Sequence, residues 1–154
     1  MKSIVIVYGT SNRDIYTLCK KVSHELERRD SLVAVQSCEI TIEREIDFCD
    51  CIIFAAQSYG TGELDIMMSK FFETLKKLDL QDKPSAIIAL GDSRYNVKGS
   101  FASEVECLDF FEKHNGSVIM NPLVIMKNTV ISSDDMIEEW GDDLIQRLKE
   151  EMAR

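Results

Sequence analysis

Short aliphatic runs alternate along the chain with stretches in which apolar residues recur at helical spacing. The runs lie at 4–7, 51–56 and 86–90 and, on either side of Asn121-Pro122, at 118–120 and 123–126. Val33 and Val35 alternate with polar neighbours and indicate one further strand that is less deeply buried. Continuous apolar strands are typical of parallel sheets covered on both faces. We therefore expect a doubly wound parallel sheet of five strands.

Four stretches between these strands present an apolar face at helical spacing. Their apolar positions are 15, 18, 19, 22 and 26; 64, 67, 68, 71, 72 and 75; 101, 105, 108 and 111; and 137, 140, 144 and 148. This spacing predicts amphipathic helices that each pack one face on the sheet, so the Met and Phe residues of the second stretch are expected in the core. Strands and helices in alternation predict an α/β fold, and the absence of repeats or linkers predicts one domain over residues 1–154.

The chain is acidic, with 18 Lys and Arg against 27 Asp and Glu and a net charge of −9. A surface of this sign repels nucleic acid and anionic membranes, and steering favours protein partners with a basic face. Solubility alone explains the charge equally well. The acidic stretches 39–50 and 134–143 are expected to be solvated, and we hypothesise that they guide the docking of a basic partner.

The cysteine pattern and the apolar runs predict a cytoplasmic protein. Five cysteines form an odd number without framework spacing, which indicates a reduced protein. No run approaches the roughly 20 apolar residues that span a bilayer, and the chain shows no signal-peptide pattern. Cys49-Asp50-Cys51 has no matching second pair, so we expect no metal site.

Glycines gather where the predicted strands end. Gly9 follows the first strand, Gly60 and Gly62 follow the third, and Gly91 follows the fourth. In a doubly wound sheet, ligands bind beyond the carboxyl ends of the strands, and glycine permits a close backbone approach there. The sequence therefore predicts a ligand site at this edge of the sheet.

Two tyrosines lie in the loops at the same edge. The loop QSYGTGEL (57–64) contains Tyr59, and the loop LGDSRYNVKGSF (90–101) contains Tyr95. Two tyrosines on neighbouring loops can enclose a flat, polarizable ring. Either one alone is more simply read as a half-exposed loop residue, but their joint placement favours a ring-binding site.

At this point the chain resembles the short-chain flavodoxins. The resemblance rests on IVYG (6–9), SYGTGEL (58–64) and LGDSRY (90–95), and it covers nearly the whole chain. It implies a flavodoxin-like sheet of order 2-1-3-4-5, one noncovalently bound FMN, and one-electron transfer between a basic-faced reductase and an acceptor protein. The protein would then be a monomeric electron carrier and not an enzyme, with no catalytic residue of its own.

The resemblance also implies how the loops would hold FMN. Tyr59 would lie against the inner face of the flavin and Tyr95 on its outer face, with the backbone of Gly91 and Asp92 at the pyrimidine edge. The Gly60–Thr61 peptide would reorient to hydrogen-bond the flavin N5 on reduction. The implied FMN-binding residues are Thr10, Ser11, Asn12, Arg13, Asp14, Ile15, Ser58, Tyr59, Gly60, Thr61, Gly62, Leu90, Gly91, Asp92 and Tyr95.

The first loop departs from the family pattern T-x-T-G-N-T, which wraps the FMN phosphate. An ungapped match keeps Thr10 but replaces the glycine by Arg13, the asparagine by Asp14 and the last threonine by Ile15. Amides at a helix start still favour an anion, and Arg13 can add charge-assisted hydrogen bonds. Asp14, in contrast, repels a phosphate dianion.

A second interpretation of this loop involves no ligand. Ser11-x-x-Asp14 resembles a capping box, in which the chain itself satisfies the start of the helix. The alternative function is then a flavodoxin-like binding or regulatory module in which FMN binding is weak or lost.

The loop after the fourth strand generates a prediction about the flavin potential. It is longer and more basic than in the family, with Arg94 and Lys98, and Thr61 replaces a common acidic residue. Fewer carboxylates near the ring ease formation of the anionic reduced flavin, so we expect a less negative second reduction potential. Reductive titration of the FMN-loaded protein measures it, and a value as low as in acid-lined flavodoxins would contradict the prediction.

Overall fold

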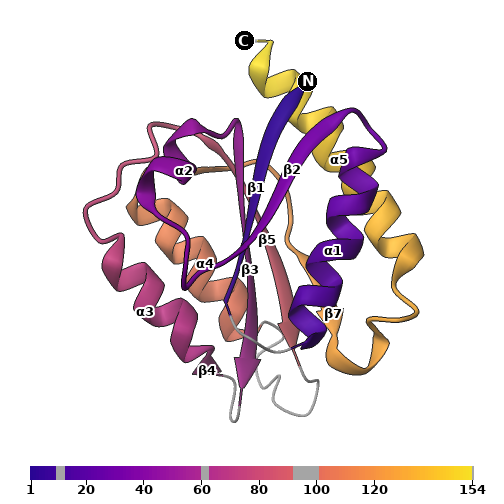
Figure 1. Ribbon diagram of the computed structural model, residues 1–154, viewed down its shortest axis with the longest axis horizontal. Coiled ribbons are helices and arrows are strands. Elements are labelled where there is room, and N and C mark those ends of the chain that lie inside the picture. The colour runs from indigo at the N-terminus through magenta and orange to yellow at the C-terminus, as the bar shows by residue number, and fades with distance from the viewer. Residues whose placement is uncertain (10–12, 60–62, 92–100, 154) are drawn as a thin grey trace.

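The structure is a computed structural model that describes residues 1–9, 13–59, 63–91 and 101–153, and a mostly parallel sheet forms its centre (Figure 1). The strands follow the order β2-β1-β3-β5-β6, with β7 also paired to β5 and β4 paired to β3. Their bounds are β1 Lys2–Tyr8, β2 Ser31–Ser37, β3 Cys51–Tyr59, β4 Glu63–Leu64, β5 Pro84–Gly91, β6 Ser117–Val118 and β7 Leu123–Met126.

The fifth predicted strand is present in two pieces. β6 pairs in parallel with the start of β5, and β7 pairs in parallel with its end. Asn121-Pro122 lies between the pieces, where proline has no N–H to give to a ladder. With the two pieces counted as one strand, the predicted order 2-1-3-4-5 is confirmed. The antiparallel strand β4 was not expected, and it forms a hairpin with the end of β3.

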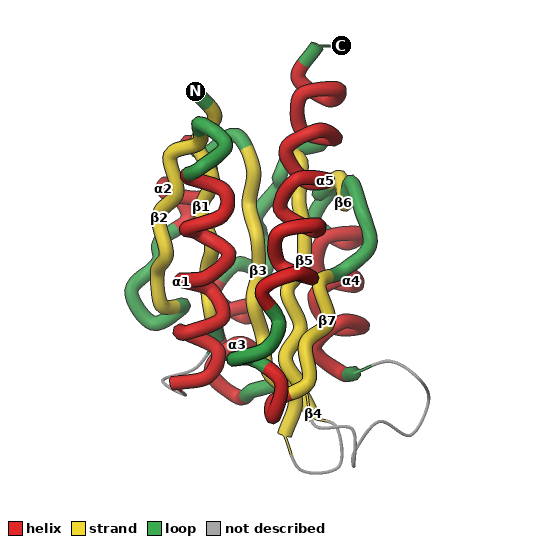
Figure 2. The backbone as a smooth tube through the Cα atoms, turned by 90° about the vertical axis from the view of Figure 1, so that its right-hand side faces the viewer, coloured by secondary structure: helices red, strands yellow, loops and turns green. Residues whose placement is uncertain are grey.

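Helices cover both faces of the sheet (Figures 1 and 2). α1 and α5 lie on one face, and α2, α3 and α4 lie on the other. The helices span α1 Arg13–Glu27, α2 Glu43–Phe48, α3 Ile66–Thr74, α4 Ala102–Lys113 and α5 Asp134–Met152, and a 3-10 turn spans Lys127–Thr129. The fold is therefore the doubly wound α/β arrangement that the hydrophobic pattern predicts.

Successive residues of the central strands point into two separate cores. In β1, Ile4 and Ile6 pack against α1 and α5, whereas Val5 and Val7 pack on the side of α3 and α4. This two-sided burial is the reason that the strands are continuously apolar. Phe54 of β3 centres the second core, and its ring stacks on Phe111 with 4.7 Å between ring centroids.

The buried faces of α1 and α5 agree with the predicted positions, but the face of α4 is different. Phe101 and Phe111 are buried as predicted, but Val105 and Leu108 are 55% and 40% exposed. Ser103, Cys107 and Phe110 are buried instead. The small residues Ser103 and Cys107 carry little hydrophobic signal, so the pattern pointed to the more apolar neighbours. Leu64 also lies in β4 rather than on the following helix.

Phe54 provides a test of the second core. Its fully buried ring contacts four other phenylalanine rings. Phe54→Ala leaves a cavity, and we expect it to lower the free energy of unfolding by about 3–5 kcal/mol in urea titration. The exposed Val105→Ala serves as the control, with an expected change within about 0.5 kcal/mol. Equal effects of the two substitutions would contradict this packing.

Candidate functional site

The carboxyl ends of three neighbouring strands, β1, β3 and β5, lie at one edge of the sheet. Parallel registers join Tyr8 to Ala55 and Gln57 to Leu90. The Gly9 amide donates to the Ala55 carbonyl at 3.0 Å, which continues the β1–β3 ladder past the end of β1. The three loops that the sequence singles out begin at these strand ends, as predicted for a doubly wound sheet.

Many of the predicted site residues lie outside the described residues. The structure describes only the backbone of Tyr59, which pairs with Glu63 at the end of the β3–β4 hairpin. The predicted residues with described side chains are Arg13, Asp14, Ile15, Ser58 and Leu90, and the backbone of Gly91 is described as well. Those outside the described residues are Thr10, Ser11, Asn12, Gly60, Thr61, Gly62, Asp92 and Tyr95.

The start of α1 lies at this edge. Arg13 is the first residue of the helix and its side chain is exposed, Asp14 is half-buried in the first turn, and Ile15 is fully buried in the core. Ile15 can therefore offer a ligand only its backbone. The first amides of a long helix carry partial positive charge and favour an anion. The predicted cap between Ser11 and Asp14 lies partly outside the described residues.

Close packing within the protein requires two of the edge glycines. A Cβ on Gly9 would lie 2.9 Å from both Asp65 Oδ2 and Met68 Cβ. A Cβ on Gly91 would lie 2.5 Å from the ring of Phe101, just before α4. Both glycines thus allow side chains from other elements to pack against the strand ends, and this packing explains them without a ligand.

Ser58 and Ser103 join the end of β3 to the start of α4. The Ser58 hydroxyl accepts a hydrogen bond from the Ser103 amide at 2.9 Å and donates one to the Ser103 hydroxyl at 3.0 Å. Both side chains are buried. The Ser58 side chain is thus occupied within the protein, and its backbone is what it can present to a ligand. Sequence reasoning did not find Ser103, because a lone serine gives no pattern.

Asp65 is a buried carboxyl group behind the first strand end. Its residue is 2% exposed, and it caps α3 by accepting from the Met67 amide at 3.2 Å. Among the described residues its Oδ2 atom has no hydrogen-bond partner. Burial raises the pKa of Asp65, and the nearby amides of Met67 and Met68 only partly oppose that shift.

The neighbourhood of Asp65 is shielded from water on several sides. Its amide donates to the Gln57 carbonyl at 2.9 Å, which closes the base of the hairpin. Cys38 lies close by, and its own burial, together with the Asp65 charge, raises the pKa of the thiol to about 12. An acidic residue directly before an apolar helix is a typical cap, and this signal could have identified Asp65 from the sequence.

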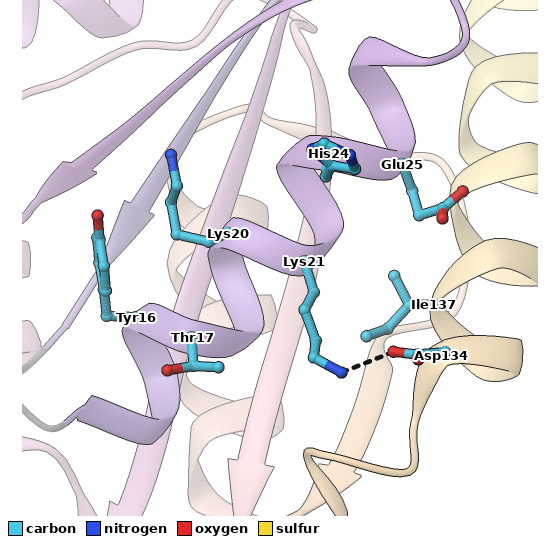
Figure 3. Close-up of a pocket in the computed structure, with 8 residues that line it drawn as sticks. All are labelled: Tyr16, Thr17, Lys20, Lys21, His24, Glu25, Asp134 and Ile137. Carbon is cyan, nitrogen blue, oxygen red and sulfur yellow. Dashed lines mark hydrogen bonds and ion pairs between the residues drawn. The ribbon is translucent and has the colours of Figure 1, made fainter.

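A separate hollow of about 520 Å³ lies between α1 and α5 (Figure 3). Lys20, Lys21 and His24 of α1 line it, together with Tyr16 and residues of α5. Lys21 forms an ion pair with Asp134 at 2.6 Å across the hollow, so it joins the two helices. This hollow contains none of the predicted site residues.

The described residues contain neither a cluster of metal-ligating side chains nor a membrane-spanning helix. No three His, Cys, Asp or Glu side chains within them gather in a group that could hold a metal ion. Within the same ranges, no helix is both long and apolar enough to cross a bilayer.

Solved structures of flavodoxins share this arrangement. Oxidised flavodoxin 2 from Bacillus cereus superposes with a TM-score of 0.82 at 19% identity, covering 94% of this chain and 99% of that one. A short-chain flavodoxin associated with a bacterial microcompartment gives 0.80 at 16% identity, with 96% and 99% covered. Fusobacterium nucleatum flavodoxin bound to flavin mononucleotide gives 0.76 at 16% identity, with 95% and 98% covered.

The chain therefore has the flavodoxin fold, over nearly its whole length and nearly the whole length of these proteins. No protein-family model matches the sequence. At identities of 16–19% to these flavodoxins, the likeness lies in the fold, and the residues of the site must be argued from this chain itself.

The buried carboxyl group of Asp65 generates a stability prediction. A raised pKa means that the protonated form suits the fold, so this contribution to stability is full at low pH and is lost as pH rises through the raised pKa. Asp65→Asn keeps the cap but removes the charge, and we expect it to stabilise the protein at pH 7 by about 1 kcal/mol. The gain should shrink on acidification, as measured by urea unfolding at several pH values.

Asp79→Asn is the matched control, because the pKa of Asp79 is shifted in the opposite direction and the expected change in stability has the opposite sign. Hydrogen bonds from the Gln81 amide and the Asn115 side chain lower the pKa of Asp79. Its contribution is present above the unfolded pKa and is lost as pH falls, so Asp79→Asn should lower stability at pH 7. The account of Asp65 is wrong if Asp65→Asn also destabilises at pH 7.

Proposed function

We propose that the chain is a low-potential one-electron carrier that binds FMN noncovalently at the carboxyl edge of its sheet. The observation that carries this proposal is that the carboxyl ends of β1, β3 and β5, where the three loops begin, lie side by side in a fold shared with an FMN-bound flavodoxin. FMN would supply the redox chemistry. The protein would bind the flavin, orient it and exclude water from it, without a catalytic residue of its own.

The site residues divide between the two ends of the ligand. The amides at the start of α1 and the segment 10–14, with the exposed Arg13 side chain, would hold the phosphate. The β3–β4 hairpin, with Ser58 to Gly62, and the segment 90–95 would hold the ring between Tyr59 and Tyr95. The described residues fit this assignment, because helix amides and strand ends lie at one edge.

The acidic surface supports the proposed partners. A net charge of −9 would steer the protein toward a basic-faced reductase and a basic-faced acceptor protein. We further propose that the chain works as a single-domain monomer in the cytoplasm, with residues 1–154 as one unit.

One observation favours a second candidate function, a binding or regulatory module with weak or lost FMN. The Oδ2 atom of Asp65, which has no hydrogen-bond partner in the part of the chain that the structure describes, lies against Gly9, where the first loop begins. Negative charge at this point opposes a phosphate dianion, as does Asp14 in the first turn of α1. Loss of two hydrogen bonds to a charged phosphate would weaken FMN binding by roughly 10²–10⁴.

Titration with FMN separates the two functions. We expect the purified chain to quench FMN fluorescence with one site per chain. Tyr95→Ala should weaken binding about tenfold, because a stacked ring is lost. Tyr16→Ala is the matched control, since Tyr16 is a partly exposed tyrosine in the α1/α5 hollow, and it should leave the affinity unchanged. A colourless protein that does not bind FMN in excess would contradict the electron-carrier proposal and favour the binding or regulatory module.

A further inference from the structure

The outer edge of β7 is open to a further strand. β7 pairs with β5 on one side, from Ile88↔Leu123 to Gly91↔Met126. In the part of the chain that the structure describes, no strand pairs with its other side. Backbone groups on the unpaired side of an edge strand are a template for another chain. Leu123 and Ile125 are buried in the core, so this template is firmly held.

A groove of about 560 Å³ runs beside this edge on the face covered by α5. Its apolar wall includes Met120, Pro122, Trp140 and Met136, the last of which is 52% exposed. The Trp140 indole N–H donates to the Asn121 carbonyl at 3.0 Å, which fixes the ring at the break between β6 and β7. The groove therefore offers an aromatic surface in a defined orientation.

The charges on this groove are mostly negative. Three carboxylates, Glu139, Asp142 and Asp143, line it with a single cation, Arg147. Arg147 is already paired with Asp143 at 3.1 Å and donates to the Ile119 carbonyl. Arg29 from α1 reaches Asp142 only at 3.5 Å. The α5 side of the edge thus suits the cationic end and the aliphatic stem of a Lys or Arg side chain.

A second hollow, of about 450 Å³, lies on the opposite face beside α4. Ile87, Leu108 and Val118 line it, and Glu112 is its only charged lining residue. The break between β6 and β7 contributes to both hollows, because each is lined by Met120, Asn121 and Pro122. The exposed Leu108 that departs from the predicted helix face lies here.

We infer that the β7 edge binds an extended segment of a partner protein in which Lys or Arg alternates with apolar residues. Its backbone would pair with β7, as in other cases of strand addition. Side chains of a strand point alternately to opposite faces. One set would enter the acidic groove beside α5, and the other would enter the apolar hollow beside α4. Neither hollow is lined by a residue predicted to bind FMN, so the inference stands with or without the flavin.

Trp140 makes the interaction measurable, because it is the only tryptophan in the chain. The probe is an acetylated and amidated six-residue peptide of alternating Lys and Val, added to the purified full chain without FMN. We expect a saturable change in tryptophan fluorescence and slower hydrogen exchange of residues 119–126. Block arrangement of the same three Lys and three Val, or N-methylation of alternate amides, should weaken binding at least fivefold.

Charge substitutions on α5 locate the site. Glu139→Lys should weaken binding of the Lys-Val peptide about fivefold, because it reverses a groove charge. Glu150→Lys is the matched control, since Glu150 is exposed on the same helix but does not line the groove, and it should change the affinity less than twofold. Both effects are measured at one fixed salt concentration.

Several results would overturn the inference. One is the absence of both a fluorescence change and exchange protection at millimolar peptide. Another is equal binding of the block or N-methylated peptide, which would show that strand pairing does not contribute. A third is equal binding of an alternating Glu-Val peptide, which would show that the acidic groove does not select a cation. Dimers in sedimentation that the peptide dissociates would assign the edge to a second copy of this chain instead.

Discussion

The parallel pairing of β3 with β1 on one side and β5 on the other is the constraint on which the rest of the structure depends. It fixes three strand ends at one edge, and the helices that connect the strands bury both faces of the sheet. The starts of the following helices are then tied to that edge. Asp65 closes the hairpin before α3, and the Ser58–Ser103 hydrogen bonds hold α4 against β3. A ligand site at these strand ends is therefore supported by a rigid sheet.

The same edge carries opposing electrostatic features. The amides at the start of α1 favour an anion, and Arg13 is exposed beside them. Asp65 places against Gly9 a carboxyl oxygen that has no hydrogen-bond partner among the described residues, and burial raises the pKa of this group. A buried carboxyl group in this position makes anion affinity at the first loop depend on whether it is ionised. The altered first loop and Asp65 thus both bear on whether this edge can bind the phosphate of FMN.

Much of the fold could be predicted because strands that are buried on both faces of a sheet are continuously apolar in the sequence. The continuous apolar runs identified the central strands, and the buried faces of α1 and α5 matched their helical spacing. The predicted face of α4 was right for Phe101 and Phe111 but wrong for Val105 and Leu108, because Ser103 is buried for its hydrogen bonds and not for its hydrophobicity. β4 was missed because a two-residue strand has no periodicity.

The candidate site could be predicted less completely. The strand ends at which its loops begin are neighbours, as predicted, but the ligand and the roles of Tyr59 and Tyr95 stay predictions. The position of Asp65 before an apolar helix signals a cap, but its burial beside Gly9 is a contact with a residue far away in the chain, which no local pattern reveals. The packing of Phe101 on Gly91 is likewise a tertiary contact that no local pattern reveals.

A crystal structure of the chain grown with FMN tests the central claim most directly. The account predicts the flavin ring between Tyr59 and Tyr95, with its phosphate at the start of α1 beside Arg13. Flavin bound at another surface, such as the hollow between α1 and α5, would contradict it. So would crystals grown in excess FMN in which this edge is closed by the chain itself, with Asp14 capping α1 and no flavin between the tyrosines.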